Sequence, residues 1–342
     1  MLRIVASEQT EQDALKLDLE AKASELSHAL REAVLGRLRR RGLVVAVSGG
    51  IDSACVAALG VRALGAERVF ALLLPERDSS PESLAYGKAL CEKLRIPYEV
   101  KDIAPILDAA GCYQARNAAV REVVPEFRPD MPWKIVLASD PLSAESLHFF
   151  HLVVRLGDGG ERRYRLPPGE YKQIVAATNF KQRTRKMLEY YHADRLHYAV
   201  GGTPNRLEYD QGFFVKLGDG AADVKPIAGL YKGQVYALAR HLGVIEEILE
   251  REPTTDTYSL EQSQEDFYYS LHYSKLDLIL WAKNHGVSAE SVATDLGYTA
   301  EQVRRVFDDI DQKRRATVYL HAPPLLLERL EELPGVAPSP AG

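Results

Sequence analysis

The residues with the clearest chemical potential lie in the string SGGIDS, residues 48–53, between an apolar run and a helical stretch. The two glycines allow a tight backbone turn and leave amide N–H groups unobstructed by Cβ atoms. The following helix directs its partly positive N-terminus at the same point, and the two serines add hydroxyl donors. The string therefore predicts a pyrophosphate pocket built from Ser48, Gly49, Gly50, Asp52 and Ser53.

Asp52 needs its own explanation, because a carboxylate repels phosphate groups unless a cation lies between them. A Mg²⁺ ion that bridges Asp52 and phosphate oxygens removes this conflict. A plain strand-to-helix turn is the alternative interpretation, but the complete string in this position favours phosphate binding. The sequence has neither a GxxxxGKS/T loop nor a GxGxxG loop after a strand, so it does not indicate a kinase-type or Rossmann-type site.

The elements that must position this loop alternate between apolar runs and helical patterns. Such alternation predicts an α/β fold with a doubly wound parallel sheet covered on both faces. The predicted strands are Leu43–Val47, Arg68–Pro75, Pro97–Ile103 and Arg195–Gly202, and the predicted helices between them are Asp52–Leu64, Ser80–Leu94 and Phe180–Tyr191.

Other segments surround this alternating core. An apolar stripe at helical spacing predicts a helix over Glu8–Arg41. Two strand-like runs, Leu147–Leu156 and Glu161–Leu166, flank a glycine-rich turn and predict an inserted β-hairpin. The predicted organisation is an N-terminal helix over 1–42, a main domain over 43–262 with an insertion at about 123–171, a helical segment over 263–330 and a disordered tail over 331–342.

Composition excludes several classes of protein. The 342 residues carry 43 Lys and Arg against 48 Asp and Glu, a net charge of −5, whereas a general nucleic-acid binder has a basic surplus. Three scattered cysteines suit neither a disulfide framework nor a Cys-x-x-Cys metal site. No apolar run approaches the roughly 20 residues of a membrane span, and the N-terminus lacks a secretory signal. We therefore expect a cytoplasmic globular protein without nucleic-acid or membrane partners.

The SGGxDS string resembles the pyrophosphate loop of the N-type ATP pyrophosphatases, which have an adenine nucleotide alpha-hydrolase-like fold and cleave ATP between the α and β phosphates. A second block, Gly201–Gly243, resembles the ammonia-dependent NAD synthetases within that superfamily almost throughout. The resemblance extends from about Val44 to Pro324.

The resemblance implies roles for individual residues. Glu208 matches a second Mg²⁺ carboxylate beside Asp52, and Lys232 matches a lysine that binds ATP phosphates. Asp219, in a GDG run, is either a turn-former or a carboxylate that receives and deprotonates ammonia. Thr203 and Thr254 match ATP-site threonines, and the implied contacts of the second substrate are Arg183, Arg185, Lys216, Asp223 and Lys313.

The implied reaction amidates deamido-NAD. Its nicotinate carboxylate attacks the α-phosphate of ATP, pyrophosphate leaves, and ammonia attacks the acyl-adenylate to give NAD and AMP. Nothing N-terminal to Leu43 resembles a glutaminase, so free ammonia or a separate glutaminase chain is expected. The family also implies a homodimer.

Two alternatives stay open. A related pyrophosphatase could amidate or ligate a different carboxylate, or the chain could be a non-catalytic adenine-nucleotide-binding module. The sequence departs from the family's pattern on the second-substrate side, at the insertion, at the aromatic segment after Gln264 and at Gln312. The insertion could cover the active site, form a dimer contact, reshape the second pocket or be a passive surface elaboration.

Overall fold

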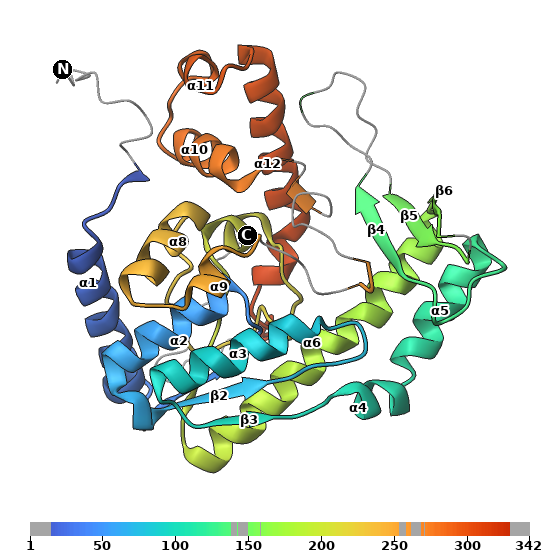
Figure 1. The fold of residues 1–342 in the computed structure, drawn as a ribbon. Coiled ribbons are helices and arrows are strands. Elements are labelled where there is room, and N and C mark those ends of the chain that lie inside the picture. Colours follow the sequence, from blue (N-terminus) through green and yellow to red (C-terminus); the bar gives the residue numbers. More distant parts are fainter. Residues whose placement is uncertain are drawn as a thin grey trace.

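A computed structural model describes residues 15–137, 142, 150–157, 159–252, 258–260, 268–269 and 271–328. Its centre is a four-stranded parallel sheet in the order β3-β2-β1-β7 (Figure 1). The strands are β1 Leu43–Ala46, β2 Val69–Leu73, β3 Tyr98–Val100 and β7 Ala199–Gly201.

Both faces of β1, β2 and β7 are buried under helices, which explains why these strands are nearly continuous apolar runs, whereas the edge strand β3 is exposed. On one face Val45 and Leu73 pack in a core with α1, α2, α3, α8 and α9. On the other face Val44 and Leu72 pack against α4, α5 and α6. The doubly wound α/β prediction is therefore confirmed. These helices are α1 Leu19–Arg31, α2 Ile51–Leu64, α3 Pro81–Leu94, α4 Ala104–Ala109, α5 Cys112–Val123, α6 Pro168–Leu196, α8 Lys232–His241 and α9 Glu246–Leu249.

The N-terminal helix is shorter than predicted within the described residues. Helix α1 ends at Arg31, a π-helical turn follows over Glu32–Arg37, and Arg39 has a left-handed φ of 53° that ends the helical path. Ala23, Leu30 and Val34 are buried in the same core as α2 and α8. Residues 1–14 of the predicted helix lie outside the described residues.

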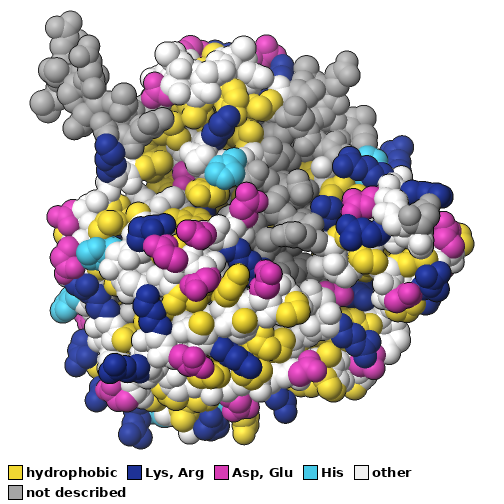
Figure 2. All heavy atoms as spheres, viewed as in Figure 1, with side chains coloured by type: hydrophobic (Ala, Val, Ile, Leu, Met, Phe, Trp, Pro, Cys, Tyr) yellow, Lys and Arg dark blue, Asp and Glu magenta, His cyan; other side chains and the backbone are white. Residues whose placement is uncertain are grey.

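The insertion is larger than the predicted hairpin. Strands β5 Phe150–Arg155 and β6 Glu161–Arg165 form that hairpin, and β4 Trp133–Leu137, which was not predicted, pairs antiparallel with β5. This second sheet has its own core against α5 and α6. In Figure 2 Lys and Arg side chains gather over the part of the surface that carries β5 and β6, where Arg155, Arg162, Arg163 and Arg165 are exposed.

The C-terminal segment is helical, as predicted. It consists of α10 Tyr273–Asn284, α11 Ala289–Leu296 and α12 Ala300–His321, which share an apolar core. That core also contains Leu207 of the short helix α7 Arg206–Gln211 and Tyr231 at the start of α8, so the segment packs directly on elements that carry predicted site residues. Among the described helices, none is long and apolar enough to cross a bilayer. The tail over 331–342 lies outside the described residues.

Candidate active site

The SGGIDS loop connects β1 to α2 at the carboxyl end of the sheet. Gly49 has a φ of +80°, and a Cβ atom there would lie 2.3 Å from the carbonyl oxygen of Ser83, so the turn requires glycine. The Ser53 hydroxyl donates to the Gly50 carbonyl at 3.0 Å and accepts from the Ser48 amide at 3.2 Å. These bonds fix the loop at the N-terminus of α2, where backbone amides favour an anion.

Asp52, Glu208 and Lys232 come together beside this loop. The Lys232 ammonium donates to Asp52 Oδ2, and Asn205 Nδ2 donates to Asp52 Oδ1 at 3.0 Å. Asn205 is also the N-cap of α7, and the Glu208 carboxylate accepts from the Asn205 amide at 3.1 Å in a reciprocal capping box. One asparagine therefore connects the two carboxylates that the sequence predicts as partners.

The electrostatics of this group favour an additional cation. Burial raises the pKa of Glu208 to about 8, and the negative charge of Asp52 adds to this effect. Burial acts to lower the pKa of Lys232, but the charges of Asp52 and Glu208 outweigh it and the net pKa is raised. Lys232 therefore stays protonated beside two partly buried carboxyl groups, and its ammonium donates to Asp52.

Asp277 holds the backbone of Lys232 in place. Its Oδ1 accepts from the Lys232 amide at 3.1 Å and its Oδ2 accepts from the Gly233 amide at 2.7 Å. Asp277 lies on α10 and is only 2% exposed, and burial raises its pKa to about 6. It therefore acts as an N-terminal cap for α8 from a helix more than forty residues along the chain.

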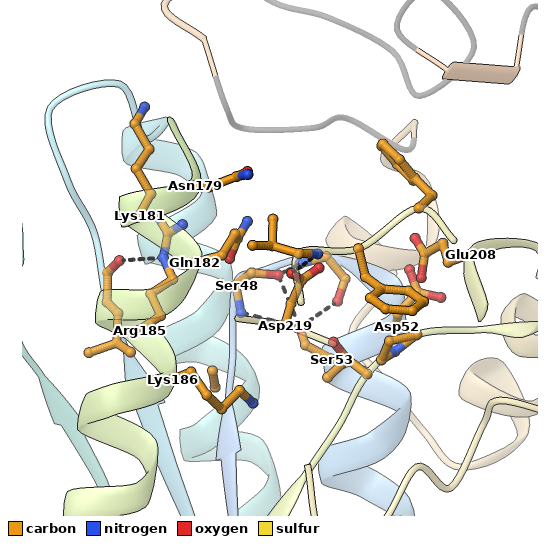
Figure 3. A pocket seen from close by; sticks show the side chains of 18 of the residues that line it. Ser48, Asp52, Ser53, Asn179, Lys181, Gln182, Arg185, Lys186, Glu208 and Asp219 are labelled. Carbon is orange, nitrogen blue, oxygen red and sulfur yellow. Dashed lines mark hydrogen bonds between the residues drawn. The ribbon is translucent and has the colours of Figure 1, made fainter. Parts of the chain in front are cut away.

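A cavity of about 750 Å³ opens in front of the loop, within the range of small-molecule pockets. Figure 3 shows its two sides: Asn179, Gln182, Arg185 and Lys186 extend from α6, while Ser48, Ser53, Asp52 and Glu208 lie opposite. The predicted residues that line it are Ser48, Gly50, Asp52, Ser53, Arg183, Arg185, Thr203, Glu208, Lys216, Asp219 and Lys232.

Three of the predicted substrate contacts line the cavity: Arg183, Arg185 and Lys216. Arg183 Nε donates to the Lys216 carbonyl at 3.3 Å, and Arg185 Nε donates to the Leu74 carbonyl at 3.2 Å, so both guanidinium groups are anchored at the cavity wall. The Lys216 ammonium donates to the carbonyls of Tyr319 and Ala322 at 2.7 and 3.0 Å, at the end of α12.

Asp223 and Lys313 are not among the described residues that line the cavity. Asp223 Oδ2 accepts from the Val200 amide of β7 at 2.7 Å, and the Lys313 ammonium bonds Asp309 at 2.8 Å and the Tyr268 carbonyl at 2.9 Å. Their substrate roles therefore stay predictions from the resemblance. Thr254 lies outside the described residues.

Asp219 is both a turn residue and a cavity residue. Its Oδ1 accepts from the Val215 amide at 2.8 Å, which closes the loop around the GDG run. Burial raises the pKa of Asp219, and the backbone hydrogen bond from Val215 opposes part of that rise. The two interpretations of this residue are thus compatible.

The sequence analysis did not identify three residues that hold parts of the site in place: Asn205, Asp277 and Lys181. Asn205 could have been found from the Asn-x-x-Glu spacing of a capping box. Asp277 gives no such local signal, since its partners are distant in sequence. The same is true of Lys181, whose buried ammonium lies 2.8 Å from Glu76 and 2.7 Å from Asp78 and so ties α6 to the segment after β2.

The residues present fit a magnesium ion that substrate would help to bind. No group of three or more His, Cys, Asp or Glu side chains suited to a metal occurs in the described part of the chain. Mg²⁺ is usually held by one or two carboxylates together with substrate phosphates and water, and Asp52 and Glu208 offer that donor set next to the phosphate loop.

Comparison with known proteins identifies the family. The family model described as NAD synthase matches residues 23–126 and 165–316, and so omits most of the inserted sheet. An NH(3)-dependent NAD(+) synthetase of Rhizobium meliloti is 56% identical over 321 residues, which cover 94% of this chain and 96% of that protein. One of Mesorhizobium japonicum is 53% identical over 319 residues, covering 93% and 99%.

Solved structures agree on the fold. The NMN synthetase of Francisella tularensis has a TM-score of 0.63 at 23% identity, covering 91% of this chain and 99% of that one. An NH3-dependent NAD synthetase of Campylobacter jejuni has a TM-score of 0.60 at 23% identity, covering 91% and 100%. From the family match and the identity to these relatives it follows that the chain belongs to the NAD synthase family.

Proposed function

We propose that this protein makes NAD⁺ from deamido-NAD, ATP and ammonia, with release of AMP and pyrophosphate. The observation that carries the proposal is the convergence of the SGGIDS loop, the carboxylates of Asp52 and Glu208 and the Lys232 ammonium at one wall of the cavity. A protein that merely binds an adenine nucleotide does not need two carboxylates beside the phosphates, whereas a pyrophosphate-releasing enzyme uses them to hold a cation.

The first step activates the acid. A carboxylate oxygen of the nicotinate ring attacks the α-phosphorus of ATP, and the bond from that phosphorus to the bridging oxygen of pyrophosphate breaks. The loop amides and Lys232 stabilise the charge of the departing pyrophosphate, and Arg183 and Arg185 are the candidates for the phosphates of the second substrate. A magnesium ion held by Asp52 and Glu208 would supply further charge neutralisation at these oxygens.

The second step forms the amide. Ammonia attacks the acyl carbon of the adenylate, and AMP leaves with the electrons of the carbon–oxygen bond. Asp219 is the candidate base for the proton that nitrogen loses, because it lines the cavity and burial raises its pKa, which strengthens it as a proton acceptor.

We also propose a cytoplasmic homodimer. Phe180, Met187 and Tyr191 are 40%, 55% and 60% exposed and share one face of α6 by their spacing of seven and four residues. This apolar stripe suits a second copy of the chain, and it lies on the helix that forms one wall of the cavity. Consumption of ATP supports a cytoplasmic location.

Product analysis tests the proposed reaction. The purified protein is incubated with ATP, Mg²⁺, ammonium and deamido-NAD, and NAD⁺, AMP and pyrophosphate are measured together; we expect equal amounts of all three. Parallel reactions replace deamido-NAD by its nicotinate mononucleotide half or by simple carboxylic acids. Pyrophosphate release with one of these acids alone would favour the related ligase, and nucleotide binding without pyrophosphate release under every condition would favour a binding module.

A further inference from the structure

The inserted sheet places one aromatic side chain at the cavity. In the β4–β5 pairing Leu137 is opposite Phe150, Ile135 is opposite Leu152, and Trp133 is opposite Val154. Alternate residues of a strand share a face, so Phe150 points to the same side as Leu152 and Val154. Those two are fully buried in the core against α5 and α6, and Phe150, at the first position of β5, lies where this core meets the cavity.

Phe150 is stacked on Tyr171 in the first turn of α6. Their ring centroids are 4.1 Å apart and the ring planes differ by 11°. Both rings are half-buried and both line the cavity. The Leu166 amide donates to the Phe150 carbonyl at 2.9 Å, so the backbone that carries this ring is held from the end of β6 as well as by β4.

The wall continues along α6 with uncharged side chains. Val175 and Thr178 follow Tyr171 at spacings of four and seven residues and line the same cavity. Asn179 and Gln182 come next, and Figure 3 shows both amide groups pointing from α6 toward Ser48. An aromatic face followed by amide donors and acceptors is suited to the face and the edge of a planar heterocycle.

Several charged groups also line the cavity, and Arg183 and Arg185 follow Gln182 on α6. Lys186, which donates to Glu189 at 2.7 Å, is on the later turns of α6, and Lys232 is beside the phosphate loop. Lys181 lines the cavity but is neutralised by its close contacts with Glu76 and Asp78. Phe150, Tyr171, Val175 and Thr178 thus form an aromatic, neutral part of the wall, and Asn179 and Gln182 continue it toward the phosphate loop.

We propose that Phe150 and Tyr171 form a subsite on which a planar ring of a nucleotide substrate stacks, with Asn179 and Gln182 at the edge of that ring. This inference rests on the proposed function and adds to it the role of the insertion. Phe150 belongs to the part of the chain that the NAD synthase model does not match. The insertion is therefore a specificity element of this cavity and not a passive elaboration.

Substitution of the two rings tests the subsite. The dissociation constants of ATP and of deamido-NAD are measured separately by calorimetry for the full-length wild type, Phe150→Leu and Tyr171→Leu. Loss of a stacking ring weakens base binding by about 1–3 kcal/mol, so we expect a rise of about 5- to 150-fold in the dissociation constant of one of the two nucleotides. Which nucleotide is affected identifies the ring that stacks. Phe150→Trp should restore binding, because its ring keeps a stacking face.

Phe127→Leu is the matched control. Phe127 is buried in the same small core but does not line the cavity, so its loss should lower the melting temperature and leave both dissociation constants unchanged. Unchanged affinities in Phe150→Leu and Tyr171→Leu, or equal losses in Phe127→Leu, would overturn the subsite. A wild type that binds both nucleotides but makes no NAD⁺ would instead overturn the proposed function, which keeps the two failures distinguishable.

Discussion

The phosphate side and the aromatic side of the cavity are built in different ways. On the phosphate side, side chains from four separate segments meet, and each is fixed by charge or by a helix cap: Asp52 by Lys232, Glu208 by Asn205, and Lys232 by Asp277. On the aromatic side, Phe150 is fixed by strand register and by packing of one small core. The NAD synthase model matches the segments of the first construction, whereas in the second it does not match residues 127–164, which include Phe150.

The difference predicts different consequences of substitution. Asp52, Glu208 and Lys232 act on phosphates that gain negative charge during the reaction. Loss of one of these side chains should therefore lower kcat. A ring that stacks on substrate acts equally before and during the reaction, so its loss should raise KM alone. Measurements of kcat and KM for variants of the phosphate side and of the aromatic side therefore test whether the two sides act differently.

The largest effect is expected for Asp52→Asn. The amide keeps an oxygen for Asn205 but removes the charge that pairs with Lys232 and that would hold a cation. We expect kcat for pyrophosphate release to fall by about 10³-fold, the scale seen when a group that stabilises transition-state charge is lost.

The control for Asp52→Asn is a measurement of folding by circular dichroism. Removal of the Asp52 charge removes one cause of the raised Glu208 pKa, which favours a charged Glu208 beside Lys232, so the variant should remain folded, with an unchanged far-ultraviolet circular dichroism spectrum. Wild-type kcat in a folded Asp52→Asn protein would show that this carboxylate neither holds a cation nor acts on the phosphates.

A smaller effect is expected for Asp277→Ala. The substitution leaves the buried amides of Lys232 and Gly233 without acceptors and frees the start of α8, so Lys232 loses its fixed position. We expect kcat/KM for ATP to fall about 10- to 100-fold, while Asp277→Asn, which keeps one acceptor, should recover part of the loss.

Ser288→Ala is the matched control for this cap. Ser288 caps α11 in the same C-terminal segment by accepting from the Ser291 amide, and its loss should cost about 1 kcal/mol of stability. Activity should be unchanged. Equal activity losses in Ser288→Ala and Asp277→Ala would show that Asp277 matters only for the stability of the segment.

Glu208→Gln should separate stability from activity. The folded protein holds the Glu208 proton up to a pKa of about 8, against an ordinary value of 4.5, so stability from this group is present below about pH 4.5 and is lost as pH rises to about 8. Glutamine stays neutral and keeps an acceptor for Asn205. The melting temperature of the variant should therefore exceed that of the wild type by about 3–6 °C at pH 8 and by much less at pH 5.

Activity and Mg²⁺ response complete this experiment. NAD⁺ formation should be reduced in Glu208→Gln, but by less than in Asp52→Asn, and Mg²⁺ with ATP should raise the melting temperature of the wild type more than that of the variant. An equal difference in melting temperature at pH 5 and pH 8 would contradict the raised pKa of Glu208 and its proposed role in holding a cation.

The sequence predicted the phosphate side far better than the aromatic side, and the physical reason is locality. The loop, its strand and its helix are adjacent in the chain, and their residue types are demanded by short-range geometry, such as the positive φ of Gly49. The parallel sheet followed from apolar runs that only burial on both faces explains. Asn205 left a local trace in its capping box.

Contacts between distant segments left no such trace. In the sequence Asp277 is one acidic residue within an apolar helical segment. Its capping role is visible only when α10 is seen packed against α8. Phe150 reads as one of several aromatic residues, because its face depends on the register with β4, a strand that was not predicted. Register and helix packing are set by tertiary structure, so the residues that position or surround substrate from afar could not be assigned from patterns.

The smallest effect is expected on the outer face of the inserted sheet, and it sharpens the comparison. Arg163 is exposed on β6 and is paired in register with Val153, on the face opposite to Phe150 and Leu152. Substitution of an exposed surface charge usually changes stability by about 0.5 kcal/mol or less. Arg163→Ala should therefore leave kcat and both KM values within twofold of the wild type at 0.15 M salt, while Phe150→Leu, thirteen positions away on the same small sheet, raises KM for one nucleotide. A comparable rise in Arg163→Ala would mean that the basic surface seen in Figure 2 attracts the polyanionic substrates, and that the insertion acts through its charge as well as through its aromatic inner face.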